Sequence, residues 1–218
     1  MLTLLGYPGT GSALAEAFLT LANISYERHD VDYSVESKEK HYLKSLNPLV
    51  QVPTLVFPDQ SVLTESLAIA LYAQSKHPEL ELILHEDMNF WRWILIINTS
   101  IYPTFCYGDS PEKWCTPLEG RKQLRMTTDQ YRNELWSQLE MQCGHPYFLG
   151  EKSCAIDYYI YVMSHWRPRQ EWFLQNCPKL SRVIQLLDAH PQLQDIWDEN
   201  FGEERLIELE DEEEEVDL

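Results

Sequence analysis

The sequence feature that most constrains the fold is a proline that opens an apolar run, Pro53-Thr54-Leu55-Val56-Phe57, with Glu65-Ser66 following at the start of a helical pattern. Because proline has no backbone N–H, it is excluded from central strands, and we expect Pro53 in a tight turn at a strand's edge, where cis proline occurs. The backbone of Val52 is then free to pair with a group outside the sheet. Since a helix N-terminus attracts a carboxylate, these features predict a slot for a peptide-like ligand with an acidic end.

Around this slot, the first part of the chain alternates strand and helix patterns. The strand, helix, strand order near the N-terminus predicts a parallel pair with a right-handed crossover. A polar helix, a hairpin of two short strands and an amphipathic helix follow. The expected strands are residues 2–7, 24–31, 54–57 and 61–63, and the expected helices are residues 13–22, 37–46 and 65–76. We therefore predict an α/β domain over residues 1–78.

Beyond Pro78 the sequence has helical patterns and no recurring strand-like alternation. The segment 155–165 is apolar on nearly all sides, which is typical of a helix at the centre of a core. Pro103 is expected to end the first helix of this part. The expected helices are residues 88–101, 118–140, 155–165, 178–190 and 191–200. These patterns predict an all-α domain over residues 86–201.

Charge and cysteine content exclude several function classes. The formal charge of the 218 residues is −18, which argues against nucleic acid and anionic membranes as partners, since both are bound through Lys and Arg. No segment has the pattern of a transmembrane helix or of a signal peptide. Five widely spaced cysteines without a CxxC pair predict free thiols in a reducing cytoplasm and no metal site. Residues 202–218 carry ten acidic residues against one arginine and are expected to be a disordered acidic tail.

Four motifs, in this order, resemble those of the cytosolic glutathione S-transferases. The segment Asn47-Pro48-Leu49-Val50-Gln51-Val52-Pro53-Thr54-Leu55 is similar to the family's Asn-Pro-x-Gly-x-Val-Pro-x-Leu, with Val50 in place of glycine. The segment Glu65-Ser66-Leu67-Ala68-Ile69 is similar to its Glu-Ser-x-Ala-Ile. Tyr147-Phe148-Leu149-Gly150 with Ala155-Ile156-Asp157 resembles the second-domain signature, and Pro178-Lys179-Leu180 with His190-Pro191 resembles its late helices.

The resemblance covers residues 1 to about 201. It implies the glutathione S-transferase fold: an α/β thioredoxin-like N-terminal domain followed by an all-α helical C-terminal domain. In the second-domain signature, Asp157 closes a capping box at the start of the core helix, with Cys154 at the cap position.

The resemblance also implies that the slot binds glutathione as a co-substrate, without a metal. Val52, before cis Pro53, would pair its backbone with the cysteinyl unit. Glu65 and Ser66 would bind the ammonium and carboxylate of the γ-glutamyl unit through charge, hydroxyl and helix N–H groups. Gln51 would lie at the glycyl end.

The catalytic position departs from the family's pattern, which places Tyr, Ser or Cys near the first turn. Gly11 stands where the bacterial Cys-type enzymes have their cysteine, and the usual tyrosine position aligns with Gly6. Thr10 lies nearest to the hydroxyl of the Ser-type enzymes, and Ser12 and Tyr7 are alternatives. A hydroxyl near a helix N-terminus lowers the pKa of a thiol, and the N–H groups of Gly11 and Ser12 could act without a hydroxyl.

By resemblance, the chain is expected to be a homodimeric detoxification transferase that conjugates glutathione to a small apolar electrophile. The aromatic residues expected at the electrophile's subsite are Tyr102, Phe105, Tyr107 and Trp114. Two alternatives stay open: a glutathione S-transferase-like interaction protein without useful turnover, and a glutathione-dependent reductase or peroxidase. The sequence does not define the electrophile.

Overall fold

A computed structural model describes residues 1–202 of the chain. The predicted acidic tail therefore lies outside the described residues, apart from Gly202. The chain divides into two compact units: the first comprises Met1–Leu80 together with the segment that begins at Asp188, and the second comprises Glu81–Leu187. Each unit is described in turn.

The first unit is built on a four-stranded mixed sheet in the order β2-β1-β3-β4. Its strands are β1 (Leu2–Gly6), β2 (Tyr26–Asp30), β3 (Thr54–Val56) and β4 (Val62–Thr64). β1 pairs with β2 in parallel and with β3 antiparallel, and β4 pairs antiparallel with β3. This arrangement confirms the predicted crossover and hairpin.

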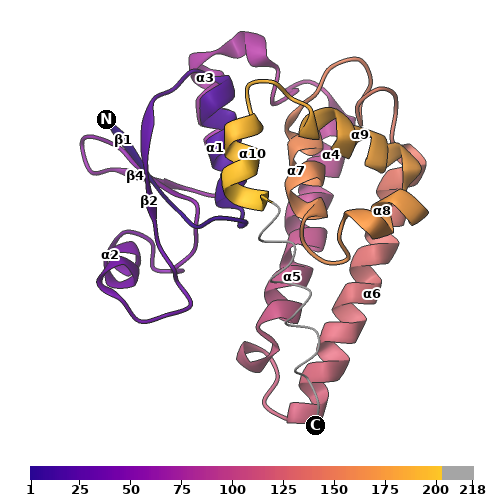
Figure 1. The fold of residues 1–218 in the computed structure, drawn as a ribbon, viewed down its shortest axis with the longest axis horizontal. Coiled ribbons are helices and arrows are strands. Elements are labelled where there is room, and N and C mark those ends of the chain that lie inside the picture. The colour runs from indigo at the N-terminus through magenta and orange to yellow at the C-terminus, as the bar shows by residue number, and fades with distance from the viewer. Residues whose placement is uncertain (203–218) are drawn as a thin grey trace. The chain divides into compact units, whose positions relative to one another are not determined.

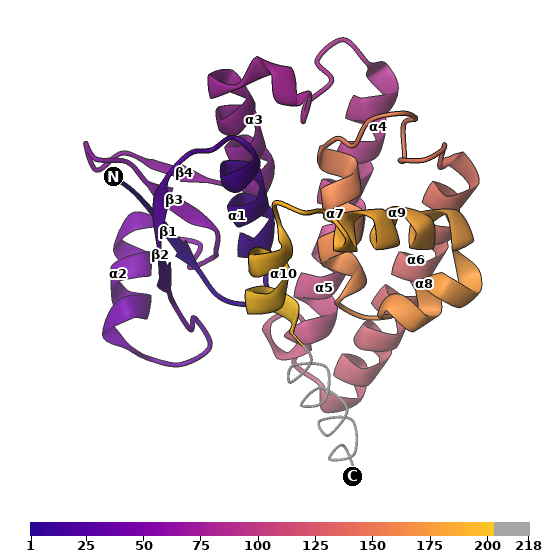
Figure 2. The same ribbon diagram turned by 45° about the horizontal axis from the view of Figure 1, so that its top comes forward.

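Helices cover both faces of this sheet because successive side chains of a strand point to opposite faces. On one face, Leu4 of β1 joins a core with Leu19 and Ile69, which belong to α1 (Ser12–Leu21) and α3 (Ser66–Lys76). On the other face, Leu5 joins a core with Leu43 of α2 (Lys38–Leu46). Figure 2 shows α2 on one side of the strands and α1 and α3 on the other. The short helix η1 (Pro78–Leu80) follows α3.

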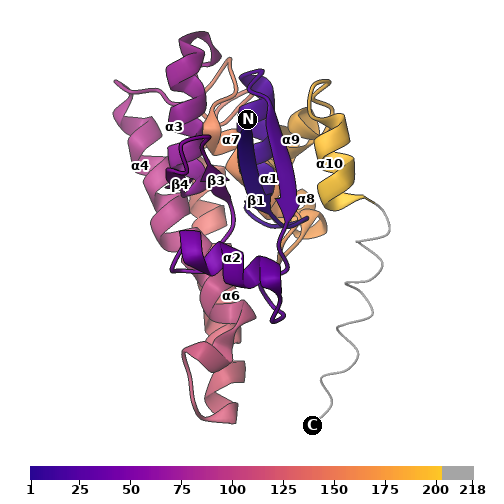
Figure 3. The ribbon, with the colours of Figure 1, turned by 90° about the vertical axis from the view of Figure 1, so that its left-hand side faces the viewer.

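The first unit also contains the last described helix, α10 (Gln194–Phe201). α10 packs against α1, beside which it lies in Figures 1 and 3. Its Ile196 and Trp197 are buried. The sequence places residues 191–200 in the helical domain, so the observed units differ from the expected domain ranges at this helix. The difference has a physical cause, because side chains of α10 bond to residues of the first unit, as described below.

The second unit is all helical. Its elements are α4 (Met88–Ile96), η2 (Ile97–Ile101), α5 (Tyr102–Asp109), η3 (Pro111–Lys113), α6 (Leu118–Gln142), α7 (Ala155–Ser164), α8 (Gln170–Asn176) and α9 (Pro178–Asp188). α5 packs along α6, as Figure 1 shows, and α4 packs against α7. The fold as a whole confirms the predicted thioredoxin-like α/β unit and all-α unit. The sequence pattern did not predict α8.

Pro103 does not end a helix as expected. α4 runs through the π-helical segment η2 directly into α5, and Pro103 lies in the first turn of α5. Proline is tolerated there because the first N–H groups of a helix have no partner within that helix. A π-helical segment shifts the hydrogen-bond register by one residue and lets the chain stay helical on both sides of the proline.

The centre of the second unit is α7, in which all ten residues are buried. Asp157 accepts hydrogen bonds from the Phe148 N–H at 2.7 Å and from the Cys154 N–H at 2.8 Å. The predicted capping box is therefore present, with Cys154 at the cap. Burial raises the pKa of Asp157 to about 6, against these backbone hydrogen bonds, which lower it.

Within residues 1–202, no helix has both the length and the apolar character needed to cross a membrane.

Candidate functional site

The register of the sheet brings the predicted site segments to one end of three neighbouring strands. Leu5 of β1 pairs with Thr54 of β3, and Thr54 pairs with Thr64 of β4. The residues that follow Leu5, precede Thr54 and follow Thr64 therefore leave the sheet at the same end. These are the turn at residues 7–12, the segment Gln51–Pro53 and the pair Glu65-Ser66. Strands lie about 4.8 Å apart, so the three segments span about 10 Å, roughly the length of an extended tripeptide.

The segment before β3 leaves backbone groups of Val52 available to a partner outside the sheet. The Val52–Pro53 peptide bond is cis, as predicted. Among residues 1–202, no hydrogen bond is formed by the backbone of Val52, as expected of a residue that pairs with something outside the sheet. The side chain of Gln51 is exposed.

The buried side chain of Asn47 holds this segment in place. Its Nδ2 donates to the Gln51 carbonyl at 3.0 Å and to Thr54 Oγ1 at 3.2 Å, and Oδ1 accepts from the Leu49 N–H at 3.1 Å. Val50, at the position of the family's glycine, has φ +53°. An L-residue in this region costs about 1–2 kcal/mol, which explains the preference for glycine and makes Val50 a strained position here.

Glu65 and Ser66 lie where β4 ends and α3 begins. Glu65 is the N-cap residue, with an exposed side chain and with φ 68° and ψ 118°. Such a backbone costs about 1–3 kcal/mol in a non-glycine residue, and strain of this kind gathers at functional sites. Ser66 is buried as the first residue of α3, whose first turn contains no acidic residue. The positive end of the α3 dipole is thus not neutralised within that turn.

The turn between β1 and α1 is unusually tight. A Cβ atom added at Gly6 would lie only 2.9 Å from the Cβ of Ser12. This approach excludes a larger side chain at Gly6, the position that aligns with the family's tyrosine. Gly11 is the buried N-cap residue of α1 and, as a glycine, has no side chain that could cap the helix. The first turn of α1 also contains no acidic residue.

Two of the three predicted hydroxyl residues meet in this turn. Thr10 Oγ1 and Ser12 Oγ lie 3.0 Å apart, and each donates to the Tyr7 carbonyl, at 2.7 and 2.8 Å. Ser12 is fully buried and also accepts from the Tyr7 N–H at 3.0 Å. Thr10 is only half-buried. If Thr10 turns its proton toward a ligand, Ser12 still donates to the Tyr7 carbonyl, so Thr10 is the hydroxyl that is available.

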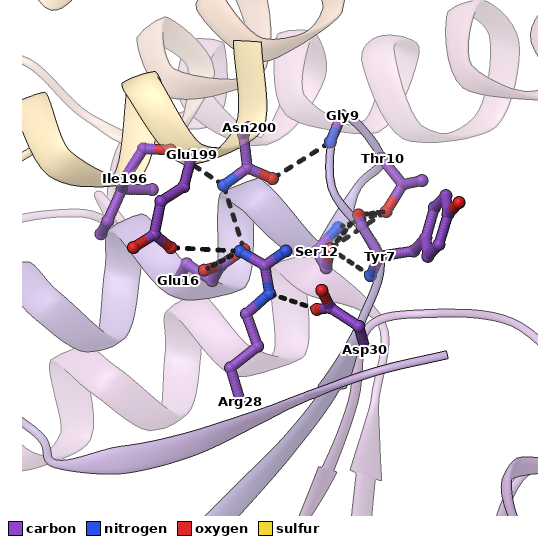
Figure 4. Close-up of polar contacts among 10 residues, drawn as sticks. All are labelled: Tyr7, Gly9, Thr10, Ser12, Glu16, Arg28, Asp30, Ile196, Glu199 and Asn200. Atoms are coloured by element: carbon purple, nitrogen blue, oxygen red, sulfur yellow. Dashed lines mark hydrogen bonds and ion pairs between the residues drawn. The ribbon is translucent and has the colours of Figure 1, made fainter. Parts of the chain in front are cut away.

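The phenol of Tyr7 lies apart from these hydroxyls. Its ring packs edge-on against Tyr33, with centroids 6.3 Å apart, and Figure 4 shows it pointing away from Ser12. Tyr7 thus contributes its backbone N–H and carbonyl to the turn.

A polar network around the buried side chains of Glu16 and Asn200 supports the turn (Figure 4). Arg28 of β2 bonds to Glu16 of α1 at 3.0 Å, to Asp30 at 2.6 Å and to Glu199 of α10 at 3.5 Å. The Nδ2 of Asn200 donates to the second Glu16 oxygen at 3.2 Å. Burial raises the pKa of the Glu16 carboxyl, and Arg28 and Asn200 act against it.

The same asparagine contacts the turn itself, because Asn200 Oδ1 accepts from the Gly9 N–H at 3.1 Å. The sequence analysis missed this network. One signal was present: Glu16 is a lone carboxylate in the apolar run Ala13-Leu14-Ala15-Glu16-Ala17-Phe18. A buried charge needs a partner, and Arg28 on the next strand supplies it.

The four predicted aromatic residues lie in the second unit as two pairs of contacts. Tyr102 and Phe105 both pack edge-on against Trp166, at 5.4 and 5.0 Å between centroids. Phe105 is buried, so it packs the interior rather than lining an open surface. Tyr107 and Trp114 stack edge-on at 4.8 Å and are 38% and 58% exposed. This pair is the most exposed part of the set, and Tyr102 is half-buried.

Among the described residues, His, Cys, Asp and Glu side chains form no group of three or more suited to hold a metal ion.

Comparisons with known proteins agree with this architecture. The family described as "Glutathione S-transferase, N-terminal domain" matches residues 15–76, which begin just after the Thr10 turn. The chain is 35% identical over 204 residues to the uncharacterized GST-like protein YncG of Escherichia coli K12, covering 92% of this chain and 98% of that protein.

Solved structures share the fold at lower identity. A glutathione transferase homologue from Sulfitobacter with bound glutathione has a TM-score of 0.77 at 20% identity, covering 91% of this chain and 97% of that one. A glutathione S-transferase from Methylobacillus flagellatus with glutathione bound has a TM-score of 0.74 at 15% identity, covering 90% and 98%.

A thioredoxin-like unit with a cis proline before its third strand, joined to an all-helical unit, defines the class of glutathione-transferase-like folds. With the long alignment to YncG, the chain belongs to the glutathione S-transferase family, in its bacterial type.

Proposed function

We propose that the protein binds glutathione and transfers its thiolate to a small apolar electrophile. The observation that carries the proposal is the sheet register, which gathers the Thr10 turn, Val52 and Glu65-Ser66 at one end of β1, β3 and β4. Two helices, α1 and α3, also begin there, and helix N-termini attract anions. Bound glutathione in the Sulfitobacter and Methylobacillus structures supports the same ligand here.

Each part of the tripeptide has a partner in this arrangement. The backbone of Val52 would pair with the cysteinyl unit as a short strand addition, because its N–H and carbonyl have no bond within residues 1–202. The exposed carboxylate of Glu65 would pair with the γ-glutamyl ammonium, and Ser66 with the neighbouring carboxylate. Gln51, exposed beside Val52, would face the glycyl end.

Thr10 is the proposed activating group. A thiolate is the nucleophile, and its formation is favoured by a hydroxyl donor and by a helix N-terminus. Thr10 is half-buried, and its hydroxyl would turn from the Tyr7 carbonyl to the thiol, whereas Ser12 is fully buried and bonds within the turn. Ser12 would therefore hold Thr10, and the backbone N–H groups of Gly11 and Ser12 would add to the positive end of α1.

The electrophile would be held by exposed aromatic surface of the helical unit. Tyr107 and Trp114 are the accessible members of the predicted set, while Tyr102 and Phe105 support the packing around Trp166. Flat apolar rings of this kind suit a small apolar electrophile better than a charged one.

A homodimer is part of the proposal. α4 exposes Met88 and Leu95, and α6 exposes Met126 and Tyr131, apolar side chains that a second copy of the chain would cover. At −18 per chain, like-charge repulsion must be overcome by such an apolar interface. Sedimentation should therefore show a dimer that tightens as salt is added; a monomer at all salt concentrations contradicts this part.

The experiment that tests the function is calorimetry with glutathione, followed by assays with apolar electrophiles, peroxides and glutathione mixed disulfides. Binding with turnover of electrophiles supports the proposal. Turnover of peroxides or disulfides alone favours a glutathione-dependent peroxidase or reductase. No binding at millimolar glutathione refutes the proposal and favours an interaction protein that keeps the fold.

A further inference from the structure

The side chain of Asn200 connects the last described helix to the Thr10 turn. It is fully buried near the C-terminal end of α10. Its Oδ1 accepts from the Gly9 N–H at 3.1 Å, across 191 positions of sequence. Its Nδ2 donates to Glu16 Oε1 at 3.2 Å and to the Ile196 carbonyl at 2.9 Å. Figure 4 shows the amide between Glu16 and Gly9.

The network determines which way the Asn200 amide points. Its NH2 group faces two acceptors, the Glu16 carboxylate and a backbone carbonyl, and its oxygen faces a backbone donor. The reversed amide would set oxygen against oxygen and N–H against N–H. Arg28 in turn holds the other Glu16 oxygen at 3.0 Å. Because these partners allow only one orientation of the Asn200 amide, its oxygen faces the Gly9 N–H.

Gly9 is the residue where this contact matters most for the turn. It has φ +70°, a conformation that glycine adopts easily and leaves easily. A hydrogen bond to its N–H restricts that freedom. The next residue is Thr10, whose backbone N–H and hydroxyl both bond to the Tyr7 carbonyl. The Gly9 conformation thus sets the direction from which the Thr10 hydroxyl meets a ligand.

We propose that Asn200 is a positioning residue for the Thr10 hydroxyl, acting through the Gly9 N–H; this rests on the proposed function. Asn200 does not touch the thiol. It keeps Gly9 in one conformation, so that the turn is already ordered and no conformational entropy is lost when Thr10 donates to the thiolate. The Asn200–Gly9 bond is not needed merely to hold α10 in place. The buried apolar residues Ile196 and Trp197 and the Arg28–Glu199 ion pair also attach this helix.

Three variants separate positioning from stability. Asn200→Ala removes the acceptor for Gly9. Asn200→Asp keeps an acceptor for Gly9 but sets a second oxygen against Glu16, so it lowers stability and retains the contact with the turn. Ile196→Ala is the matched control, because it loosens the same helix through an apolar residue and leaves the Gly9 contact in place. All three are made in the full-length chain.

The readouts are amide hydrogen exchange of Gly9 and Thr10 in the ligand-free protein and the thiol pKa of bound glutathione. In Asn200→Ala we expect faster exchange at Gly9 and about threefold to tenfold less thiolate at a given pH, the loss equivalent to one neutral hydrogen bond. Asn200→Asp should lower thermal stability and keep slow exchange at Gly9, and Ile196→Ala should lower thermal stability and keep a thiol pKa close to that of the wild type.

The outcomes distinguish the inference from the proposed function. If Asn200→Ala leaves the thiol pKa unchanged, or if Ile196→Ala raises it equally, Asn200 is structural and the inference is refuted while the proposed function stands. If glutathione bound to the wild type titrates like free glutathione, the proposed function is refuted and the inference with it.

Discussion

Asp157 tests how much burial contributes to the value of a helix cap. A second aspartate in the same unit, Asp87, caps backbone N–H groups near solvent and serves for comparison. Asp157 accepts from the N–H groups of Phe148 and Cys154 in a fully buried setting. Asp87, at the N-cap of α4, accepts from the N–H groups of Asn89 and Phe90 at 2.8 and 3.3 Å, near solvent.

Replacement by alanine has different consequences at the two positions. At Asp87, water can replace the carboxylate, so Asp87→Ala should cost about 1 kcal/mol, the usual value of an N-cap. Asp157→Ala leaves two buried donors unsatisfied, each costing about 1–3 kcal/mol, or about 2–6 kcal/mol together. That is a large part of the total stability of a typical protein of about 5–15 kcal/mol.

The assay is urea denaturation of both variants, followed by tryptophan fluorescence and circular dichroism. We expect Asp157→Ala to lose at least twice the free energy of unfolding that Asp87→Ala loses. Equal losses in the two variants would show that burial does not determine the value of the capping box, and would refute this reasoning.

The pKa of Asp157, raised to about 6 by burial, predicts that lowering the pH from 7 to 5 stabilises the wild type relative to Asp157→Asn. The Asp157 carboxyl has a pKa near 4 in the unfolded chain, so the folded state binds its proton more tightly. Protonation therefore adds about 3 kcal/mol to the free energy of unfolding below pH 4, and this stabilisation is lost as pH rises through 6. Denaturation of both proteins at a series of pH values should show it, and a difference in stability that does not change with pH would count against it. Asn47→Ala, which removes one of the two donors to the Gln51 carbonyl and the acceptor for the Leu49 N–H, should weaken glutathione binding about tenfold by calorimetry, whereas the exposed Ser45→Ala should not. Glu65→Gln removes the partner of the ammonium and should weaken binding at least tenfold, with a smaller salt dependence; Glu39→Gln, a surface control on α2, should match the wild type.

Parts of the fold that depend on local sequence could be predicted. The Val52-Pro53 turn, the Glu65-Ser66 helix start and the Asp157 capping box each occupy a few neighbouring residues, and proline chemistry and capping rules apply to them directly. The parallel β1–β2 pair and the β3–β4 hairpin follow from the strand patterns and the usual crossover, whereas the antiparallel β1–β3 pairing that joins them does not.

Contacts between distant residues could not be predicted from such rules. Asn200 and Gly9 are 191 positions apart, and nothing in a short window shows that α10 packs on α1. Pro103 was misread because its effect depends on the preceding turn, where the π-helical segment lets α5 begin. The sequence could not decide which hydroxyl of the turn faces a ligand. Thr10 and Ser12 carry the same chemical group and differ in burial, which only the structure gives.

The most direct test of the central claim is the ultraviolet absorbance of the thiolate of bound glutathione, titrated against pH in the wild type, Thr10→Val and Thr10→Ser. Valine keeps the shape of threonine without the hydroxyl, and serine keeps the hydroxyl. The account predicts a thiol pKa well below the usual value of about 8.5 in the wild type and in Thr10→Ser, and a value near that of free glutathione in Thr10→Val. A wild-type pKa equal to that of free glutathione, or a Thr10→Val titration that overlays the wild type, would contradict it.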